Sequence, residues 1–310
     1  MRRVAALVVI GLLVLGAYES PGSGRRGSPR PSRGSARHGV PASVGDVPTA
    51  AGTHRMKIDV GTPGHREYLI HVPPVLARER FRSGRPVRPP PLVVALHGGA
   101  DDMSGFEKKT GFDGLADDHG FLAVYPGGFA FTWNAGDCCG PARVAHIDDV
   151  GFLTKLIDHL TGAGLADPKR VYVTGFSNGA GMAYRFACEV TGKVAAFGVV
   201  SGALVTACHP SRPVSVMVWH GTADRNVPYG GGGHRDFNDR RPFPPVIRAV
   251  DFWRRADGLS HLRTAGAAGC LSTGRGGVDV VLCTVTGVGH QWPSGVSGRL
   301  WDFFAAHSRT

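Results

Sequence analysis

A serine flanked by glycines occurs at Gly175-Phe176-Ser177-Asn178-Gly179, which is the G-x-S-x-G pattern of hydrolytic nucleophiles. The preceding run Val171–Thr174 is typical of a buried strand, and a helix is expected from Asn178 to Val190. A sharp turn between strand and helix projects the serine hydroxyl, and glycines beside it leave room because a Cβ there would collide with neighbouring chain. The sequence therefore predicts that Ser177 is a nucleophile.

Such a serine needs a base, and the base needs a carboxylate to orient it. In this architecture they follow later strands in the chain order Ser, Asp, His. Asp224 comes just after the apolar run Val214–Trp219, and His290 lies in a glycine-rich loop after Val278–Val285. We expect Asp224 and His290 to complete a catalytic triad with Ser177. The alternatives are a turn-forming aspartate and a surface loop histidine.

Two backbone N–H groups are expected to bind the oxyanion that forms during acyl transfer. One should belong to Asn178, directly after the nucleophile, and the other to the loop Leu96-His97-Gly98-Gly99. We favour the Gly99 N–H, because glycine lets the backbone approach a substrate closely. His97 is expected to brace this loop by hydrogen bonds rather than to act in catalysis.

Apolar runs bounded by turn residues predict the strands that must carry these loops. They lie at 68–72, 92–96, 121–125, 171–174, 195–200, 214–219 and 278–285, with the first as an edge strand. Helices are expected between them, at 104–119, 149–161, 178–190, 245–256 and 297–307. This alternation favours an α/β fold, with a mostly parallel central sheet and helices on both faces.

The first 54 residues differ in composition from the rest of the chain. Residues 1–20 contain Arg2, Arg3 and an apolar run from Val4 to Ala17, as in a signal peptide, and an uncleaved membrane anchor is the alternative. Residues 21–54 are rich in Pro, Gly, Ser and Arg and predict a disordered linker. We therefore expect a secreted protein with a catalytic domain at 55–310.

The positive charge says little about partners. Of the formal net charge of +11, residues 1–50 supply +5, from seven Arg less Glu19 and Asp46. No basic run with interleaved aromatic residues occurs in the expected domain, so we expect no nucleic-acid partner. Arg225 and Arg235 are interpreted as solvated loop charges. We expect a monomer whose only contact with a membrane would be an uncleaved anchor.

Six cysteines fit an exported protein, in which disulfides persist. The pairing cannot be deduced from sequence alone. The pair we favour is Cys270 with Cys283, which flank a glycine-rich turn and an expected strand. No C-x-x-C or H-E-x-x-H spacing occurs, so we expect no metal site, and acyl transfer by a serine needs no diffusible cofactor.

Seven motifs, in order along residues 66–305, carry a resemblance to a known family. They are L-H-G-G at 96–99, W-N-A-G-D-C-C at 133–139, D-D-V-G-F at 148–152, G-F-S-N-G-A-G-M at 175–182, H-G-T-A-D at 220–224, V-P-Y at 227–229 and G-H-Q-W-P at 289–293. The chain resembles the polyhydroxybutyrate depolymerase and feruloyl esterase group of α/β-hydrolases, in the carbohydrate-esterase family that also holds acetylxylan esterases. The resemblance implies an α/β-hydrolase fold and a secreted serine esterase with Ser177, Asp224 and His290 as its triad.

Substrate choice is less constrained by the sequence. Trp133, Trp292 and Tyr229 are candidates for an aromatic wall around an acyl or phenolic group, with core packing as the alternative. Polymer-degrading members carry a separate substrate-binding domain, for which the chain after His290 leaves no room. We therefore expect short-chain hydroxyalkanoate, feruloyl or acetyl esters, either small molecules or pieces of polysaccharide or polyester. The alternatives are an acyltransferase on the same scaffold, a peptidase and a non-catalytic cell-surface binding protein.

Overall fold

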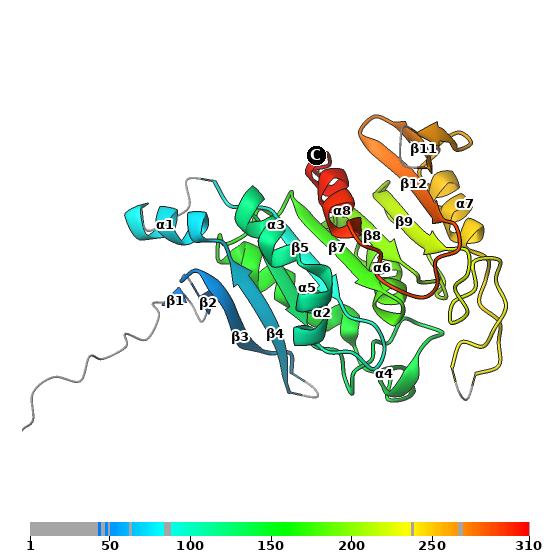
Figure 1. The fold of residues 1–310 in the computed structure, drawn as a ribbon. Helices are drawn as coiled ribbons and strands as arrows, with labels where there is room; N and C mark the ends of the chain where they lie inside the picture. Colours follow the sequence, from blue (N-terminus) through cyan, green and yellow to red (C-terminus); the bar gives the residue numbers. More distant parts are fainter. Residues whose placement is uncertain are drawn as a thin grey trace, which may run out of the picture. The chain divides into compact units, whose positions relative to one another are not determined.

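A computed structural model describes residues 43–44, 47–48, 50–61, 64–83, 88–236, 239–265 and 269–309 (Figure 1). The expected signal peptide, residues 1–20, and most of the expected linker, residues 21–54, lie outside the described residues. Strand β3 (Gly52–Asp59) begins before residue 55, and β1 (Ser43–Val44) pairs with β2 (Val47–Pro48) ahead of it. None of the helices in these described ranges is both long and apolar enough to span a membrane.

Ten strands of the described residues form one sheet, in the order β10-β11-β12-β9-β8-β7-β5-β6-β4-β3. Its further strands are β4 (His65–Val72), β5 (Leu92–Leu96), β6 (Leu122–Pro126), β7 (Val171–Phe176), β8 (Ala196–Val200), β9 (Ser215–Gly221), β10 (Arg263–Ala265), β11 (Cys270–Arg275) and β12 (Val278–Val285). The block from β12 to β6 is parallel, and the outer strands on both sides are antiparallel. The mostly parallel sheet is confirmed.

The expected edge strand at 68–72 is not an edge. It belongs to β4, which pairs with β3 on one side and with β6 on the other. Strand β3 was not predicted because its side chains alternate between half-buried and exposed, and several of them are polar. An edge strand that is covered on one face only produces such a weak apolar pattern.

Helices cover both faces of the sheet (Figure 1). They are α1 (Pro74–Ser83), α2 (Met103–Thr110), α3 (Phe112–His119), α4 (Gly140–Val144), α5 (Asp149–Gly162), α6 (Asn178–Glu189), α7 (Val246–Ala256) and α8 (Val296–Ala305). Side chains of β5 alternate between two apolar clusters, one built with α5, α6 and α7 and the other with α2, α3 and α8. This two-sided burial explains why the central strands are continuously apolar.

The single helix expected at 104–119 is two helices. Gly111 lies between them with φ 61°, and its N–H donates to the carbonyl of Glu107 to close α2. A left-handed glycine is a common helix terminator, because other residues adopt this conformation less readily. The chain therefore changes direction at Gly111 and restarts as α3.

The parallel register brings the loops of interest to one edge of the sheet. Leu96 pairs with Gly175 and Val285 pairs with Gly221, so β5 ends beside β7 and β12 ends beside β9. Strands β7, β8 and β9 are neighbours in the same parallel block. Because the carboxyl ends of parallel strands share an edge, the loops after β5, β7, β9 and β12 can meet there.

All six cysteines are in disulfides. Cys270 and Cys283 lie directly opposite each other on β11 and β12 and are joined. Cys188 at the end of α6 is joined to Cys208, in the connection between β8 and β9. The adjacent residues Cys138 and Cys139 form the third pair.

Candidate active site

Ser177 lies at the turn between β7 and α6 with a strained backbone. Its φ is 55° and its ψ is −117°, a conformation that residues with a side chain seldom adopt. A Cβ on Gly179 would collide with the carbonyl oxygens of Leu96 and His97, and one on Gly175 would collide with the carbonyl of Gly179. The two glycines therefore let α6 begin against the loop after β5, with the serine held at the tip of the turn.

The structure brings the three expected triad residues together. Nε2 of His290 lies 2.9 Å from Oγ of Ser177, and Nδ1 of His290 lies 2.8 Å from Oδ2 of Asp224. With the proton on Nδ1, the imidazole donates to Asp224 and accepts from the Ser177 hydroxyl. The backbone N–H groups of Asn226 and Val227 both donate to Oδ1 of Asp224, each at 2.9 Å.

Asp224 is held as a carboxylate. Its burial raises the pKa, but hydrogen bonds from His220, His290 and the Val227 N–H outweigh burial and keep the pKa well below its usual range. Nε2 of His220 is 3.3 Å from Oδ2 of Asp224 and donates to the Val227 carbonyl at 2.8 Å. His220 was not singled out from the sequence, although its spacing of four residues from Asp224 in the H-G-T-A-D motif was a visible signal.

Gly99 and Asn178 lie beside Ser177 around one cavity. Neither of their backbone N–H groups has an acceptor within the part of the chain that the structure describes. His97 braces the loop before Gly99, since its Nδ1–H donates to the Gly98 carbonyl at 2.7 Å and its Nε2 accepts from the Gly128 N–H at 2.9 Å. Burial lowers the pKa of His97, which keeps the ring in the neutral form that these two bonds require.

The cavity next to Ser177 has about 640 Å³ of open space, part of it solvent at the mouth. Most of the residues around it are small or apolar, and the polar ones come from the turn between β7 and α6 and from the loop after β9. They are Gly99, Ala135, Cys138, Cys139, Ser177, Asn178, Gly181, Ala203, Val205, Asn226, Val227, His234, Arg235 and Phe243. No described group of His, Cys, Asp or Glu side chains is arranged to hold a metal ion.

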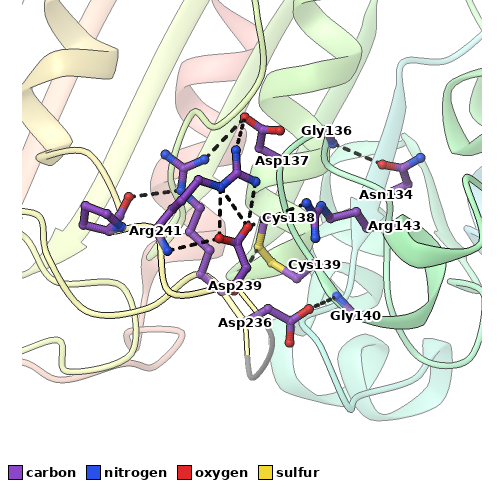
Figure 2. Close-up of polar contacts among 12 residues, drawn as sticks. Asn134, Gly136, Asp137, Cys138, Cys139, Gly140, Arg143, Asp236, Asp239 and Arg241 are labelled. Carbon is purple, nitrogen blue, oxygen red and sulfur yellow. Dashed lines mark hydrogen bonds and ion pairs between the residues drawn. A yellow bond between two sulfur atoms is a disulfide. The ribbon is translucent and has the colours of Figure 1, made fainter.

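Two loops that form the cavity wall are joined by polar contacts (Figure 2). Oδ2 of Asp137 lies 3.4 Å from Nη1 of Arg235 and 3.2 Å from Nη1 of Arg241. Asp239 pairs with Arg241 at 2.6 Å and lies 3.7 Å from Nη2 of Arg143. Arg235 is thus not the solvated charge expected from the sequence, because its side chain is only 16% exposed.

The three aromatic residues expected at the substrate do not line this cavity. Trp133 is fully buried, and its Nε1–H donates to the carbonyl of His97 at 2.9 Å. Trp292 packs edge-on against Phe106, and the hydroxyl of Tyr229 bonds to Thr284 at 2.8 Å. Their polar atoms are satisfied inside the protein, so the packing alternative describes them. Phe243 and the Cys138–Cys139 pair line the cavity instead.

Comparison with known proteins gives a consistent set of relatives. The family model described as esterase PHB depolymerase matches residues 67–229. "Putative esterase NocK" of Nocardia uniformis subsp. tsuyamanensis is 32% identical over 74% of this chain and 71% of its own length. Feruloyl esterase B of Piromyces equi is 29% identical over 69% of this chain, and the match spans 41% of that protein. The bifunctional acetylxylan esterase/xylanase XynS20E of Neocallimastix patriciarum is 30% identical over 69% of this chain and 30% of its own length.

Solved structures agree on the fold. An acetyl xylan esterase from Aspergillus awamori superposes with a TM-score of 0.59 at 18% identity, over 82% of this chain and 99% of that chain. A ferulic acid esterase from Anaeromyces mucronatus gives a TM-score of 0.52 at 14% identity, over 82% and 91%. At these identities the likeness concerns the α/β-hydrolase fold alone.

Proposed function

The chain belongs to the esterase PHB depolymerase family of serine esterases, and on that premise we propose that Ser177, His290 and Asp224 are its nucleophile, base and orienting acid. The observation that carries the proposal is the continuous hydrogen-bonded chain from the Ser177 hydroxyl through His290 to Asp224. Two N–H groups without acceptors among the described residues, those of Gly99 and Asn178, lie around the same cavity. This combination is what acyl transfer by a serine requires.

In the proposed reaction, Nε2 of His290 takes the proton from Ser177 as Oγ attacks the ester carbonyl. The carbonyl oxygen becomes an oxyanion that accepts hydrogen bonds from the N–H groups of Gly99 and Asn178. His290 then protonates the leaving alcohol, which leaves an acyl group on Ser177. In the second step His290 takes a proton from water as the water attacks the acyl carbonyl, and it returns that proton to Oγ of Ser177 as the Oγ–acyl bond breaks and the acid leaves. The ionised Asp224 stabilises the imidazolium that forms in both steps.

The cavity favours compact acyl groups. Ala135, Gly181, Ala203 and Val205 offer small apolar surfaces, and Phe243 offers an aromatic one. Acetyl, hydroxybutyryl and flat feruloyl groups suit such a lining, because their nonpolar parts can be buried there. We therefore propose short-chain hydroxyalkanoate, feruloyl or acetyl esters as the substrate class. The acetyl xylan and feruloyl esterases among the relatives support this range.

We propose that the protein is secreted. Its three disulfides are of the kind that persists in an oxidising compartment and is rare in the reducing cytosol. The apolar run near the N-terminus supports the same proposal. The cell fraction that holds the active protein, and the N-terminal sequence of that protein, would test it.

The test of the catalytic proposal is Ser177→Ala, measured with p-nitrophenyl acetate, methyl ferulate, acetylated xylan and hydroxybutyrate oligomers. We expect kcat/KM to fall by about 10⁴-fold or more on each substrate that the wild type cleaves, with an unchanged circular dichroism spectrum. Ser272→Ala, on β11 and outside the cavity lining, is the matched control and should retain wild-type activity. A Ser177→Ala protein that hydrolyses these esters at the wild-type rate would refute the assignment.

A further inference from the structure

Trp133 makes hydrogen bonds to both loops that carry the proposed oxyanion N–H groups. Its indole Nε1–H donates to the carbonyl of His97 at 2.9 Å, two residues before Gly99. Its backbone N–H donates to Oδ1 of Asn178 at 2.7 Å, and its carbonyl accepts from Nδ2 of Asn178 at 2.9 Å. We infer that Trp133 is a positioning residue that fixes the separation of the Gly99 and Asn178 N–H groups. The inference rests on the proposed function.

Asn178 contributes to this arrangement with two different parts. Its main-chain N–H lies at the start of α6, next to the strained Ser177, whereas its side-chain amide is buried against Trp133. The amide satisfies both the N–H and the carbonyl of the Trp133 backbone, as a neighbouring strand would. Two simultaneous bonds restrain both the distance and the rotation of the turn relative to Trp133.

Trp133 is itself anchored to the interior of the fold. The next backbone N–H, of Asn134, donates to Oδ2 of Asp149 at 2.8 Å. Oδ1 of the same carboxylate accepts from Nη2 of Arg66 at 2.8 Å, and this ion pair is buried. Nη2 of Arg66 also donates to the carbonyl of Gly127 at 2.8 Å. Separating the charges of a buried ion pair is strongly destabilising. The pair of Arg66 and Asp149 therefore holds the backbone next to Trp133 in place.

The spacing of the two N–H groups matters only when negative charge develops. An oxyanion donor is effective when it lies 2.7–3.1 Å from the position of the oxyanion, and small displacements of catalytic groups are costly. Trp133 does not line the cavity, so its replacement should leave substrate binding largely intact. Loss of its indole N–H should therefore lower kcat rather than raise KM.

The test is Trp133→Phe, which keeps an aromatic ring in the core and removes the indole N–H. Trp253→Phe is the matched control, because Trp253 is also fully buried but its Nε1–H has no acceptor among the described residues. We expect Trp133→Phe to lower kcat about tenfold per site titrated with a fluorophosphonate, with KM within about twofold and an unchanged pH profile. Affinity for a trifluoromethyl ketone, which mimics the tetrahedral intermediate, should fall in parallel with kcat/KM. Trp253→Phe should keep wild-type values.

Several results would overturn the inference. These are an unchanged kcat in Trp133→Phe, a loss no larger than that of Trp253→Phe, or a raised KM at constant kcat. If Trp133→Phe does not fold, Asn178→Ala supplies the second measurement, since it removes both side-chain bonds to Trp133 and keeps the main-chain N–H. A wild-type enzyme without esterase activity, or an active Ser177→Ala protein, would instead refute the proposed function. An active wild type and an inactive Ser177→Ala protein, together with an unchanged kcat in Trp133→Phe, would refute the inference and leave the proposed function intact.

Discussion

A buried carboxyl group at the end of α7 predicts that stability depends on pH. Asp257 is 7% exposed, and its Oδ1 accepts a hydrogen bond from the Val214 N–H at 3.3 Å. Its Oδ2 is buried without a partner in the described part of the chain. Burial raises the pKa of Asp257 from 3.8 to about 7, and the Val214 N–H offsets this only in part. The negative end of the α7 dipole also disfavours the ionised form.

The direction of the effect follows from which state binds the proton more tightly. Because the folded-state pKa of Asp257 lies above its unfolded value, the folded state is favoured by protonation and loses stability as the pH rises from about 4 to about 7. The resulting penalty is about 2 kcal/mol at pH 5 and about 4 kcal/mol at pH 8. Removing this titration should therefore change the free energy of unfolding at pH 8, relative to that at pH 5, by about 2 to 3 kcal/mol.

Guanidinium unfolding of the wild type and of Asp257→Asn, with the disulfides intact, measures this difference. We expect the stability of Asp257→Asn relative to the wild type to rise by about 2 to 3 kcal/mol between pH 5 and pH 8. The comparison between pH values removes any constant effect of the substitution. Asp251→Asn on the same helix is the control, because its side chain is 39% exposed. A difference in the free energy of unfolding between the wild type and Asp257→Asn that stays constant with pH, or changes in the opposite direction, would refute the reasoning.

Two further predictions concern the acid of the proposed triad and the loops around the cavity. Asp224→Asn should lower kcat by about 10⁴-fold with p-nitrophenyl acetate, because the amide would no longer hold His290 in the required tautomer. Unchanged turnover would move this role to another residue. Asp239→Asn should raise KM by about threefold at nearly constant kcat, because Arg241 and Arg143 lose the carboxylate between the two loops. Asp158→Asn, which removes a surface pair with Lys193 away from the cavity lining, is its control, and an equal effect of the two would contradict the prediction.

The central sheet could be predicted because its strands are buried on both faces. Strands β5 and β12 have the bounds expected from their apolar runs. Strands β3, β10 and β11 lie towards the edges of the sheet and have mixed sequences that do not stand out from loops. Local patterning therefore predicts the doubly covered strands, whereas edge strands depend on the partner that they pair with.

The grouping of the three residues of the proposed triad was predictable for a different reason. Ser177 has a local signal, and Asp224 and His290 follow from chain order and from their positions after strands. The surroundings were not predictable. The sequence leaves two roles open for Trp133, a substrate contact and core packing, because an aromatic residue suits either. Only the bonds of Trp133 to His97 and Asn178 distinguish them. The cavity wall depends on how two long loops pack, which their sequences do not specify.

The cavity wall and the proposed triad are carried by different parts of the chain, and this has a consequence for how such proteins can change their substrate. Ser177 and Asp224 are carried by turns directly after the strands β7 and β9, whereas much of the wall comes from loops joined to each other by Asp137, Asp239 and Arg241. Substitutions within those loops can reshape the wall while Ser177 and Asp224 stay in place. Natural variation, or a library confined to the loops, can therefore change which esters fit the cavity without moving the residues of the proposed triad. Changing an arginine together with its aspartate partner would keep the two loops joined while other loop residues are varied.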